Sequence, residues 1–175
     1  MAILGVDDFK SRLTGGGARA NMFKVTCNFP AYAQGNTEFT SFMCKGAQLP
    51  GSIIAPIEVP FRGRKLIIAG DRTFEPWSIT VINDGEFVVR DSFERWMNGI
   101  NQHNENTGLS DPVDYQADLI VEQLRRDGTV SKTYDIRGAF PSNISAIDLS
   151  ADSENTIEEF TVEFQLQYWE SNTTS

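Results

Sequence analysis

The sequence lacks the features that mark most metal-binding, disulfide-stabilised and membrane-spanning proteins. It has one histidine and two cysteines, so neither a Cys/His metal cluster nor a disulfide framework can be assembled from it. No apolar run approaches the roughly 18 residues that span a bilayer. The N-terminus has no basic segment followed by a long apolar segment, as a signal peptide would. We therefore expect a chain made in a cytoplasm, with no membrane anchor and with Cys27 and Cys44 as reduced thiols packed among apolar residues.

Positive charge is also scarce. The 175 residues include 15 Lys and Arg against 24 Asp and Glu, a formal charge of -9. From Ser142 to Ser175 the chain carries seven carboxylates and no Lys or Arg. Tight binding to phosphates needs clustered cations, so this composition argues against a protein that holds nucleic acid. The acidic segment is either a solubilising surface or a surface that nucleic acid passes without sticking, and charge alone does not decide between them.

No catalytic constellation emerges from the remaining polar residues. His103 lies among asparagines and glutamine in a polar stretch typical of a solvated loop. Asp71 and Arg72 are a conceivable base and anion clamp, but Gly70-Asp71 is more typical of a turn between two strands. A glycosidase pair would need two carboxylates on one side, whereas Glu158 and Glu159 are neighbours and face opposite ways on a strand. We expect no enzyme activity and no cofactor.

Residues 1–20 are predicted to form an arm outside the main domain. Val6, Phe9 and Leu13 are spaced as the apolar side of a short amphipathic helix. Three glycines at positions 15–17 end that helix and form a flexible hinge. A short apolar helix on a hinge buries little by itself, so it needs a partner in its own domain or on a neighbouring subunit.

From Met22 onward, alternation of apolar and polar residues predicts β-strands. Pro56 and Pro60 interrupt one of these strands and assign it to a sheet edge. Asp127-Gly128 joins the predicted strands 117–124 and 130–137 as a type I′ hairpin turn. The alternating sets are Trp77, Ile79 and Val81; Ile57, Val59 and Phe61; and a final strand with Phe160, Val162, Phe164, Leu166 and Tyr168 on one side.

One substantial helix is predicted from about Glu86 to Gln102. Its apolar residues form a single stripe, which indicates packing against a core. These residues are Val89, Phe93, Trp96, Met97 and Ile100. The chain as a whole is expected to be mainly β, an antiparallel two-sheet β-sandwich or partial barrel with one flanking α-helix and a short N-terminal helical arm. We divide it into an arm (1–20), a β-sandwich domain (21–170) and a C-terminal tail (171–175).

The run FRGRKLIIAGDRTFEPWSITVIND at 61–84 resembles the signature of the tail tube family of T-even-type contractile bacteriophages. The resemblance continues through the helix with Phe93 and Trp96, through Gly138-Ala-Phe-Pro-Ser-Asn, and to the final strand with Tyr168-Trp169-Glu170. It covers essentially the whole chain in order. The positions that we assign to the family motif are Gly70, Asp71, Arg72, Thr73, Phe74, Trp77, Trp96, Tyr168 and Trp169.

The resemblance implies a structural subunit of a virion tail, assembled in the host bacterial cytoplasm. Hexameric rings of such subunits stack into a hollow tube inside a contractile sheath, and double-stranded DNA passes through it without specific binding. The implied partners are further copies of the chain, the sheath protein, and the baseplate and tail terminator proteins. The alternatives are a baseplate tube initiator, a secretion or injection-system tube, a carbohydrate-binding β-sandwich and a hydrolase. A carbohydrate-binding module would expose an aromatic platform, whereas we expect Trp77, Trp96 and Trp169 to be buried.

If the channel wall consists of two hairpins, we expect its strands at 37–45, 53–65, 115–125 and 129–138. Alternation then divides each strand into a core side and a channel side. It assigns Ile57, Val59 and Phe61 to the core. The carboxylates expected to line the channel are Glu58, Asp118, Glu122 and Asp135.

Overall fold

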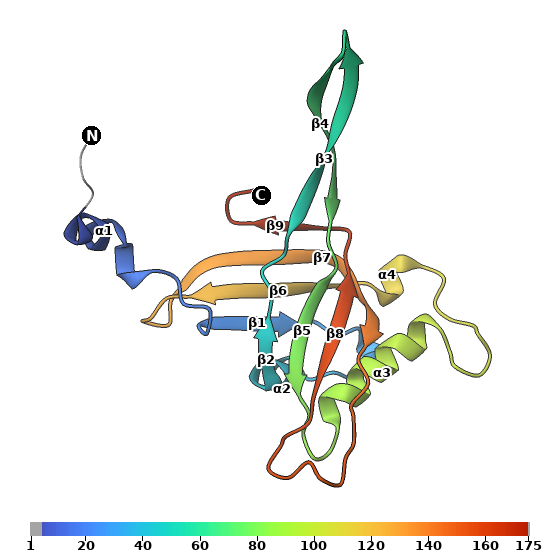
Figure 1. The fold of residues 1–175 in the computed structure, drawn as a ribbon. Coiled ribbons are helices and arrows are strands. Elements are labelled where there is room, and N and C mark those ends of the chain that lie inside the picture. Colours follow the sequence, from blue (N-terminus) through green and yellow to red (C-terminus); the bar gives the residue numbers. More distant parts are fainter. Residues whose placement is uncertain (1–4, 175) are drawn as a thin grey trace.

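The computed structural model describes residues 5–174, and its centre is an antiparallel sheet of seven strands (Figure 1). The strand order is β1-β6-β7-β8-β5-β2, and β9 also pairs with β7. The strands of this sheet are β1 (Phe23–Cys27), β2 (Cys44–Ala47), β5 (Trp77–Ile82), β6 (Ala117–Leu124), β7 (Val130–Ile144), β8 (Glu159–Gln165) and β9 (Tyr168–Ser171).

The long strand β7 belongs to both halves of this sheet. Its first part pairs with β6 and β9, and its last part, from Phe140 to Ile144, pairs with β8. In Figure 1, β1, β6 and β7 run across the view while β2, β5 and β8 run upright, so the two halves cross. Gly138 has a φ of 61° at the bend, a conformation that a side chain disfavours. The predicted mainly antiparallel sandwich is confirmed, with β7 connecting its two halves.

The core lies between these halves and follows the predicted alternation. Along β5 and β8, every second side chain is buried and the intervening ones are partly or fully exposed. Burying one such aliphatic or aromatic side chain contributes about 1.5–3 kcal/mol, which makes these positions the main source of stability. The buried members on the two strands are Trp77, Ile79, Val81, Phe160, Val162 and Phe164.

Helix α3 (Val88–Ile100) closes the core, and the prediction of a helix there is confirmed. The Asp84 carboxylate accepts a hydrogen bond from the backbone N–H of Val88 at 3.0 Å, which satisfies the first amide of the helix. Phe93 and Trp96 are fully buried. Their rings contact Phe164 of β8, with centroid distances of 5.9 and 6.0 Å.

The expectation of a strand over 37–45 is wrong, because residues 37–43 form a helix. The side chain of Asn36 accepts a hydrogen bond from the backbone N–H of Phe39 and caps this helix, α2 (Thr37–Met43). Only the last residues of the segment pair as a strand, in β2. The other short helices are α1 (Val6–Arg12), η1 (Thr14–Gly16), η2 (Ala31–Ala33) and α4 (Pro112–Tyr115).

The predicted single final strand is broken into β8 and β9. Both pair with β7, and the break at 166–167 lies beside the bend of β7 at Gly138. The break shifts the alternation by one residue. Tyr168 is therefore exposed, contrary to expectation, and Trp169 takes the inward side opposite Ile136.

The hairpin of β6 and β7 is confirmed, but its turn is not type I′. A type I′ turn needs two residues with positive φ, and only Gly128 has one here, at 85°. The backbone N–H of Gly128 donates to the carbonyl of Arg125 at 2.9 Å, which closes a longer turn. The Asp127 carboxylate accepts hydrogen bonds from the side chain and backbone of Thr129, and these lower its pKa. These local hydrogen bonds stabilise the turn with Asp127 outside the left-handed conformation that a type I′ turn requires.

A second, two-stranded sheet projects from the body as a long hairpin, β3 (Ser52–Phe61) and β4 (Arg64–Phe74) (Figure 1). Strands of this length extend about 30 Å. The turn is Arg62-Gly63, and both residues have positive φ (46° and 78°). A two-residue turn of this kind matches the twist of the paired strands.

The expected turn at Gly70-Asp71 is therefore wrong, since both residues lie inside β4. The register shifts between Ile54 and Pro56, which places an extra residue in β4 beside Ala55. A Cβ at Gly70 would lie 2.6 Å from the carbonyl oxygen of Ala55, so only glycine fits this close approach. The position marks a β-bulge rather than a turn.

Candidate functional site

The side chains that could bind a metal ion are not clustered in the described part of the chain. His103 is exposed, and residues 5–174 contain no group of three His, Cys, Asp or Glu side chains that could hold a metal ion. Cys27 is buried and Cys44 partly buried, and both are free thiols. Burial raises the pKa of both thiols, that of Cys44 to about 11, so neither is a ready nucleophile at neutral pH. No helix in this part is long and apolar enough to cross a membrane.

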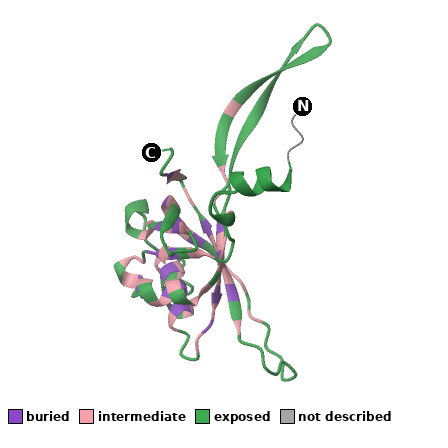
Figure 2. Cartoon of the chain, turned by 90° about the vertical axis from the view of Figure 1, so that its left-hand side faces the viewer, coloured by how far each residue is buried: buried purple, intermediate pink, exposed green. Residues whose placement is uncertain are grey.

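The most unusual surface is one side of the β3–β4 hairpin. Register pairs Ile57 with Ile68 and Val59 with Leu66, so these apolar side chains share one side of the ribbon. Their exposed fractions range from 40% for Val59 to 66% for Phe61, which lies on the same side at the tip. Figure 2 shows the hairpin almost entirely exposed, in contrast to the mixed body. We call this set, Ile57, Val59, Phe61, Leu66 and Ile68, the hairpin face.

The expectation that Ile57, Val59 and Phe61 join the core of their own chain is wrong. They do share one side, opposite Glu58, as alternation predicted, but the hairpin extends away from the body and no described residue of the chain covers that side. On the other side Glu58 forms an ion pair with Lys65, which lies diagonally across in β4, opposite Pro60. An exposed pair of this kind contributes little to stability.

Aromatic residues of the proposed family motif attach the base of the hairpin to the body. The indole N–H of Trp169 donates to the carbonyl of Gly51 at 3.0 Å, and its ring contacts Phe74 edge to face at 6.3 Å between centroids. The indole N–H of Trp77 donates to the carbonyl of Gln48 at 2.5 Å. These contacts hold both chain segments that enter and leave the hairpin, while Trp96 lies in the core.

Three of the four predicted channel carboxylates share one side of the sheet formed by β1, β6, β7 and β9. Glu122 lies opposite Lys24, and Asp135 lies opposite Glu170. Arg137 interacts with three carboxylates on this side: Asp118 at 2.9 Å, Glu170 at 3.6 Å and Asp135 at 3.7 Å.

We call this side the acidic sheet face: Asp118, Glu122, Asp135 and Glu170, with the cations Lys24 and Arg137. The hydrogen bond to Asp118 is the main reason that the pKa of Arg137 is raised, so the guanidinium stays charged. The face keeps an excess of negative charge, but it is less acidic than a wall of unpaired carboxylates. Alternation alone identified the carboxylates and missed Arg137 and Glu170, because the pairing of β7 with β9 depends on the break after β8.

The N-terminal helix α1 extends from the body, as Figure 1 shows. Val6, Phe9 and Leu13 are exposed by 72%, 64% and 42%. All three glycines at 15–17 have positive φ, between 68° and 82°. The predicted helix and its glycine stop are confirmed, and the apolar side of the helix has no cover within the described chain.

The sequence held a signal for the hairpin that we missed. The mainly apolar stretch 53–61 and the apolar run 66–68 are separated by a short polar segment, Arg62-Gly63-Arg64-Lys65, which is typical of a hairpin turn. The expected strand over 53–65 runs through this turn and is wrong there, since the turn was expected at Gly70-Asp71. Recognising Arg62-Gly63 as the turn would have predicted two long paired strands.

Known proteins match the sequence of this chain over nearly its whole length. Residues 18–172 match the family described as phage tail tube protein. The chain belongs to the phage tail tube protein family. The subunit is a structural component of a virion tail tube, and its 39% identity to a tail tube protein of Enterobacteria phage T4 confirms the resemblance to T-even-type tube proteins.

Relatives from several phages share this length and family. Tail tube protein gp19 of Enterobacteria phage T4 is 39% identical over 168 residues, 94% of this chain and 99% of that protein. The tail tube protein of Serratia phage KSP90 is 30% identical over 170 residues, 95% of each chain.

Solved structures share the fold at low sequence identity. A chain of the anti-feeding prophage baseplate superposes with a TM-score of 0.67 at 16% identity, covering 88% of this chain and 94% of that one. A chain of the sheath–tube complex of an extracellular contractile injection system gives 0.62 at 15% identity, covering 93% and 96%.

Proposed function

We propose that this tail tube subunit forms hexameric rings that stack into a hollow conduit for double-stranded DNA within a contractile sheath. The hairpin face carries the proposal. A monomer rarely exposes so many large apolar side chains on one long ribbon. An isolated two-stranded ribbon is also marginally stable in water, so this one requires a covering surface. In a ring that cover is supplied by the neighbouring copies.

Symmetry supports a second copy as that cover. Within residues 5–174, β3 pairs with β4 and with no other strand, and Pro56 and Pro60 leave its outer edge with few donors. Packing hairpins side by side around a ring covers apolar faces and protects strand edges in every copy at once. The solved baseplate chain with the same fold comes from a 6-fold symmetrised assembly, which supports the hexameric state.

The channel wall is assigned to the acidic sheet face and to the side of the hairpin that lies opposite the hairpin face. We assign Glu58, Asp118, Glu122 and Asp135 to the lumen, joined by Glu170, with Lys65, Lys24 and Arg137 as partial counter-charges. DNA carries about one negative charge per 1.7 Å of helix axis. A wall with a modest excess of carboxylates offers DNA no net attraction, and the cations keep neighbouring carboxylates from repelling one another.

The arm is assigned to contacts between subunits. We assign residues 1–20 to a unit separate from the β-sandwich domain 21–170 and residues 171–175 to a short tail, of which Ser171, in β9, still pairs with Tyr134. The exposed apolar side of α1, formed by Val6, Phe9 and Leu13, packs on an adjacent copy. The glycines allow the arm to take the orientation that this contact requires.

The remaining partners follow from a tube's position in a tail. The sheath protein surrounds the tube, the baseplate and terminator proteins bind its two ends, and assembly takes place in the host cytoplasm. The subunit has no catalytic role. A tube initiator or an injection-system tube is the alternative that shares this fold, and the 39% identity to a phage tail tube protein favours the phage tube.

Electron microscopy of the purified chain tests the proposal. We expect rings with six-fold symmetry, or tubes, that form more readily as the concentration rises. Sedimentation velocity over the same concentration range measures the fraction of the chain that remains monomeric. A chain that stays monomeric at every concentration, with neither rings nor tubes, contradicts the proposal.

A further inference from the structure

We propose that the acidic loop between β7 and β8 of one subunit docks into an arginine-lined pocket beside the N-terminal arm of another. This contact rests on the proposed assembly into rings and stacks. It adds a specific charged contact to the apolar one made by the hairpin face. The two surfaces are described in turn below.

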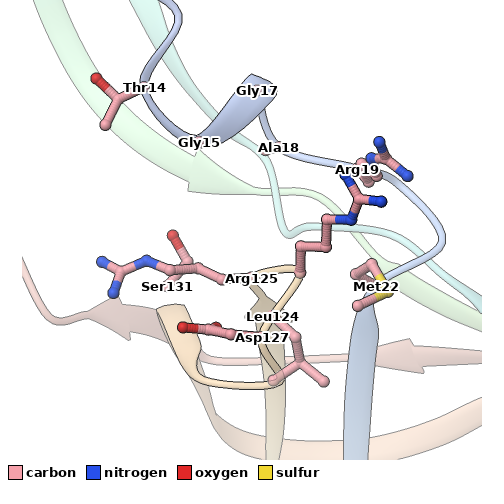
Figure 3. A pocket seen from close by; sticks show the side chains of 11 residues that line it. Thr14, Gly15, Gly17, Ala18, Arg19, Met22, Leu124, Arg125, Asp127 and Ser131 are labelled. Atoms are coloured by element: carbon pink, nitrogen blue, oxygen red, sulfur yellow. The ribbon is translucent and has the colours of Figure 1, made fainter.

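The pocket lies between the arm and the turn of the β6–β7 hairpin, and we call it the arginine pocket (Figure 3). Its volume is about 510 Å³. Arg19 comes from the segment after the glycines, and Arg125 and Arg126 come from the turn. Met22 and Leu124 add apolar lining. In a chain with only 15 cations, three beside one cavity are a marked concentration.

These cations are not neutralised within the described chain. No ion pair among residues 5–174 includes Arg19, Arg125 or Arg126. The carboxylate that lines the pocket, Asp127, accepts both hydrogen bonds of Thr129 and is held in the turn. The pocket therefore keeps a net positive charge that favours a carboxylate ligand.

The loop at 145–158 has the opposite character. Asp148, Asp152 and Glu154 form no ion pair in the described part of the chain. Leu149 and Ile157 are 79% and 68% exposed. A loop with free carboxylates and two exposed aliphatic side chains has the composition of an interface rather than of a purely solvating segment.

The two surfaces match in both charge and polarity. Carboxylates of the loop face guanidinium groups of the pocket, and Leu149 or Ile157 packs against Met22 and Leu124. In Figure 1 the loop lies at the end of the body opposite the hairpin, whereas the arm and the β6–β7 turn, whose residues line the pocket, lie on the left. A contact between two different surfaces of identical copies is heterologous, and such contacts build rings and stacks. Electrostatic complementarity of this kind fixes register between copies.

A DNA phosphate is the competing ligand for three arginines. The apolar lining of the pocket and the net charge of -9 both favour an acidic protein loop over nucleic acid. The experiment therefore includes a short duplex DNA as a probe.

Charge reversal on each side, and on both together, tests the contact. We expect Arg125→Glu with Arg126→Glu to raise the protein concentration needed for tubes about tenfold or more. Asp152→Arg with Glu154→Arg should have a similar effect, and the combination of both pairs should restore assembly. Arg125→Lys with Arg126→Lys keeps the charge and should retain assembly. Glu105→Arg, on an exposed loop elsewhere, is the matched control for the acidic side.

A cross-link between two variants, each with one added cysteine, tests the geometry. Ser131→Cys lies at the pocket and Ser153→Cys in the loop. We expect a disulfide-linked dimer under oxidising conditions only when the two variants are mixed and assembled, because the contact joins different surfaces. Native Cys27 and Cys44 are buried or partly buried and serve as the background.

Normal assembly of the Arg125→Glu, Arg126→Glu variant, with no cross-link in the mixed tubes, overturns this contact and leaves the proposed tube function intact. If that variant assembles normally but loses binding to the short duplex, the pocket binds nucleic acid instead. Failure of the unmodified chain to form rings contradicts the proposed function itself.

Discussion

The body strands β5 and β8 and the hairpin strands β3 and β4 carry the same alternating pattern, but the burial of their apolar side chains differs. On β5 and β8 the apolar positions are buried, with Val81 and Phe164 wholly inaccessible. On the hairpin the equivalent positions, Val59 and Leu66, are 40% and 57% exposed. The body strands face another half-sheet and helix α3, whereas the hairpin extends beyond any other part of its chain. Alternation therefore predicts which side chains share one side of a strand. It does not predict whether that side is covered by the same chain or by another one.

The largest expected effect is in the body, where Trp96→Ala should lower the free energy of unfolding by about 3–5 kcal/mol. The ring of Trp96 is fully buried, and its indole N–H donates to the carbonyl of Tyr115 at 2.7 Å. Urea unfolding of the unassembled subunit measures the loss. A small change in stability together with a large loss of assembly would instead place Trp96 at an interface.

On the hairpin, Val59→Asp with Leu66→Asp should prevent assembly and change the stability of the subunit by less than about 0.5 kcal/mol. Both side chains are already exposed in the single chain, so charging them costs little until a second copy must cover them. Electron microscopy and urea unfolding give the two readouts. Val113→Asp is the control, since Val113 is 82% exposed outside the hairpin. Tubes formed by the double variant would show that the hairpin face is not an interface.

Deleting residues 1–17 should leave the body folded and weaken polymerisation, by about tenfold in the concentration required. No described residue of α1 is buried, so the core loses nothing. Thermal unfolding followed by circular dichroism checks the body, and sedimentation checks assembly. Loss of the cooperative transition would show that the arm is part of the folded β-sandwich domain.

The smallest effect on assembly is expected for Glu58→Lys, Asp118→Lys and Glu122→Lys combined, which should still form tubes. These tubes should retain duplex DNA at low salt and release it as salt rises, because the wall becomes cationic. Glu86→Lys, Glu105→Lys and Asp114→Lys give the same charge change outside the proposed lumen. DNA retention equal in both sets would mean that the three carboxylates do not face the channel.

Much of the body was predictable because its signals are local or periodic. The stripe with Phe93 and Trp96 predicted α3, and the alternation of Trp77, Ile79 and Val81 predicted β5. The break between β8 and β9 was not predictable in this way, since it follows from a bend in a partner strand at Gly138.

Alternation predicted two features of the candidate site. The apolar hairpin residues share one side of their ribbon, and Asp118, Glu122 and Asp135 share one side of the sheet. The position of Arg137 among three carboxylates was not predictable, because it requires the register of β6, β7 and β9 together. The arginine pocket was likewise missed. It combines Arg19 with Arg125 and Arg126, more than 100 positions apart, and no periodic signal connects them.

The direct connection from β4 into β5 has a mechanical consequence. Only Glu75 and Pro76 separate the two strands, so a pull or push on the hairpin passes into β5 along its own axis. β5 is held on both sides, by β2 and β8. Hydrogen bonds between antiparallel strands lie perpendicular to the strands, so an axial load strains the whole ladder in shear instead of opening one bond at a time. The subunit is thus connected to resist force along the direction in which its hairpin points.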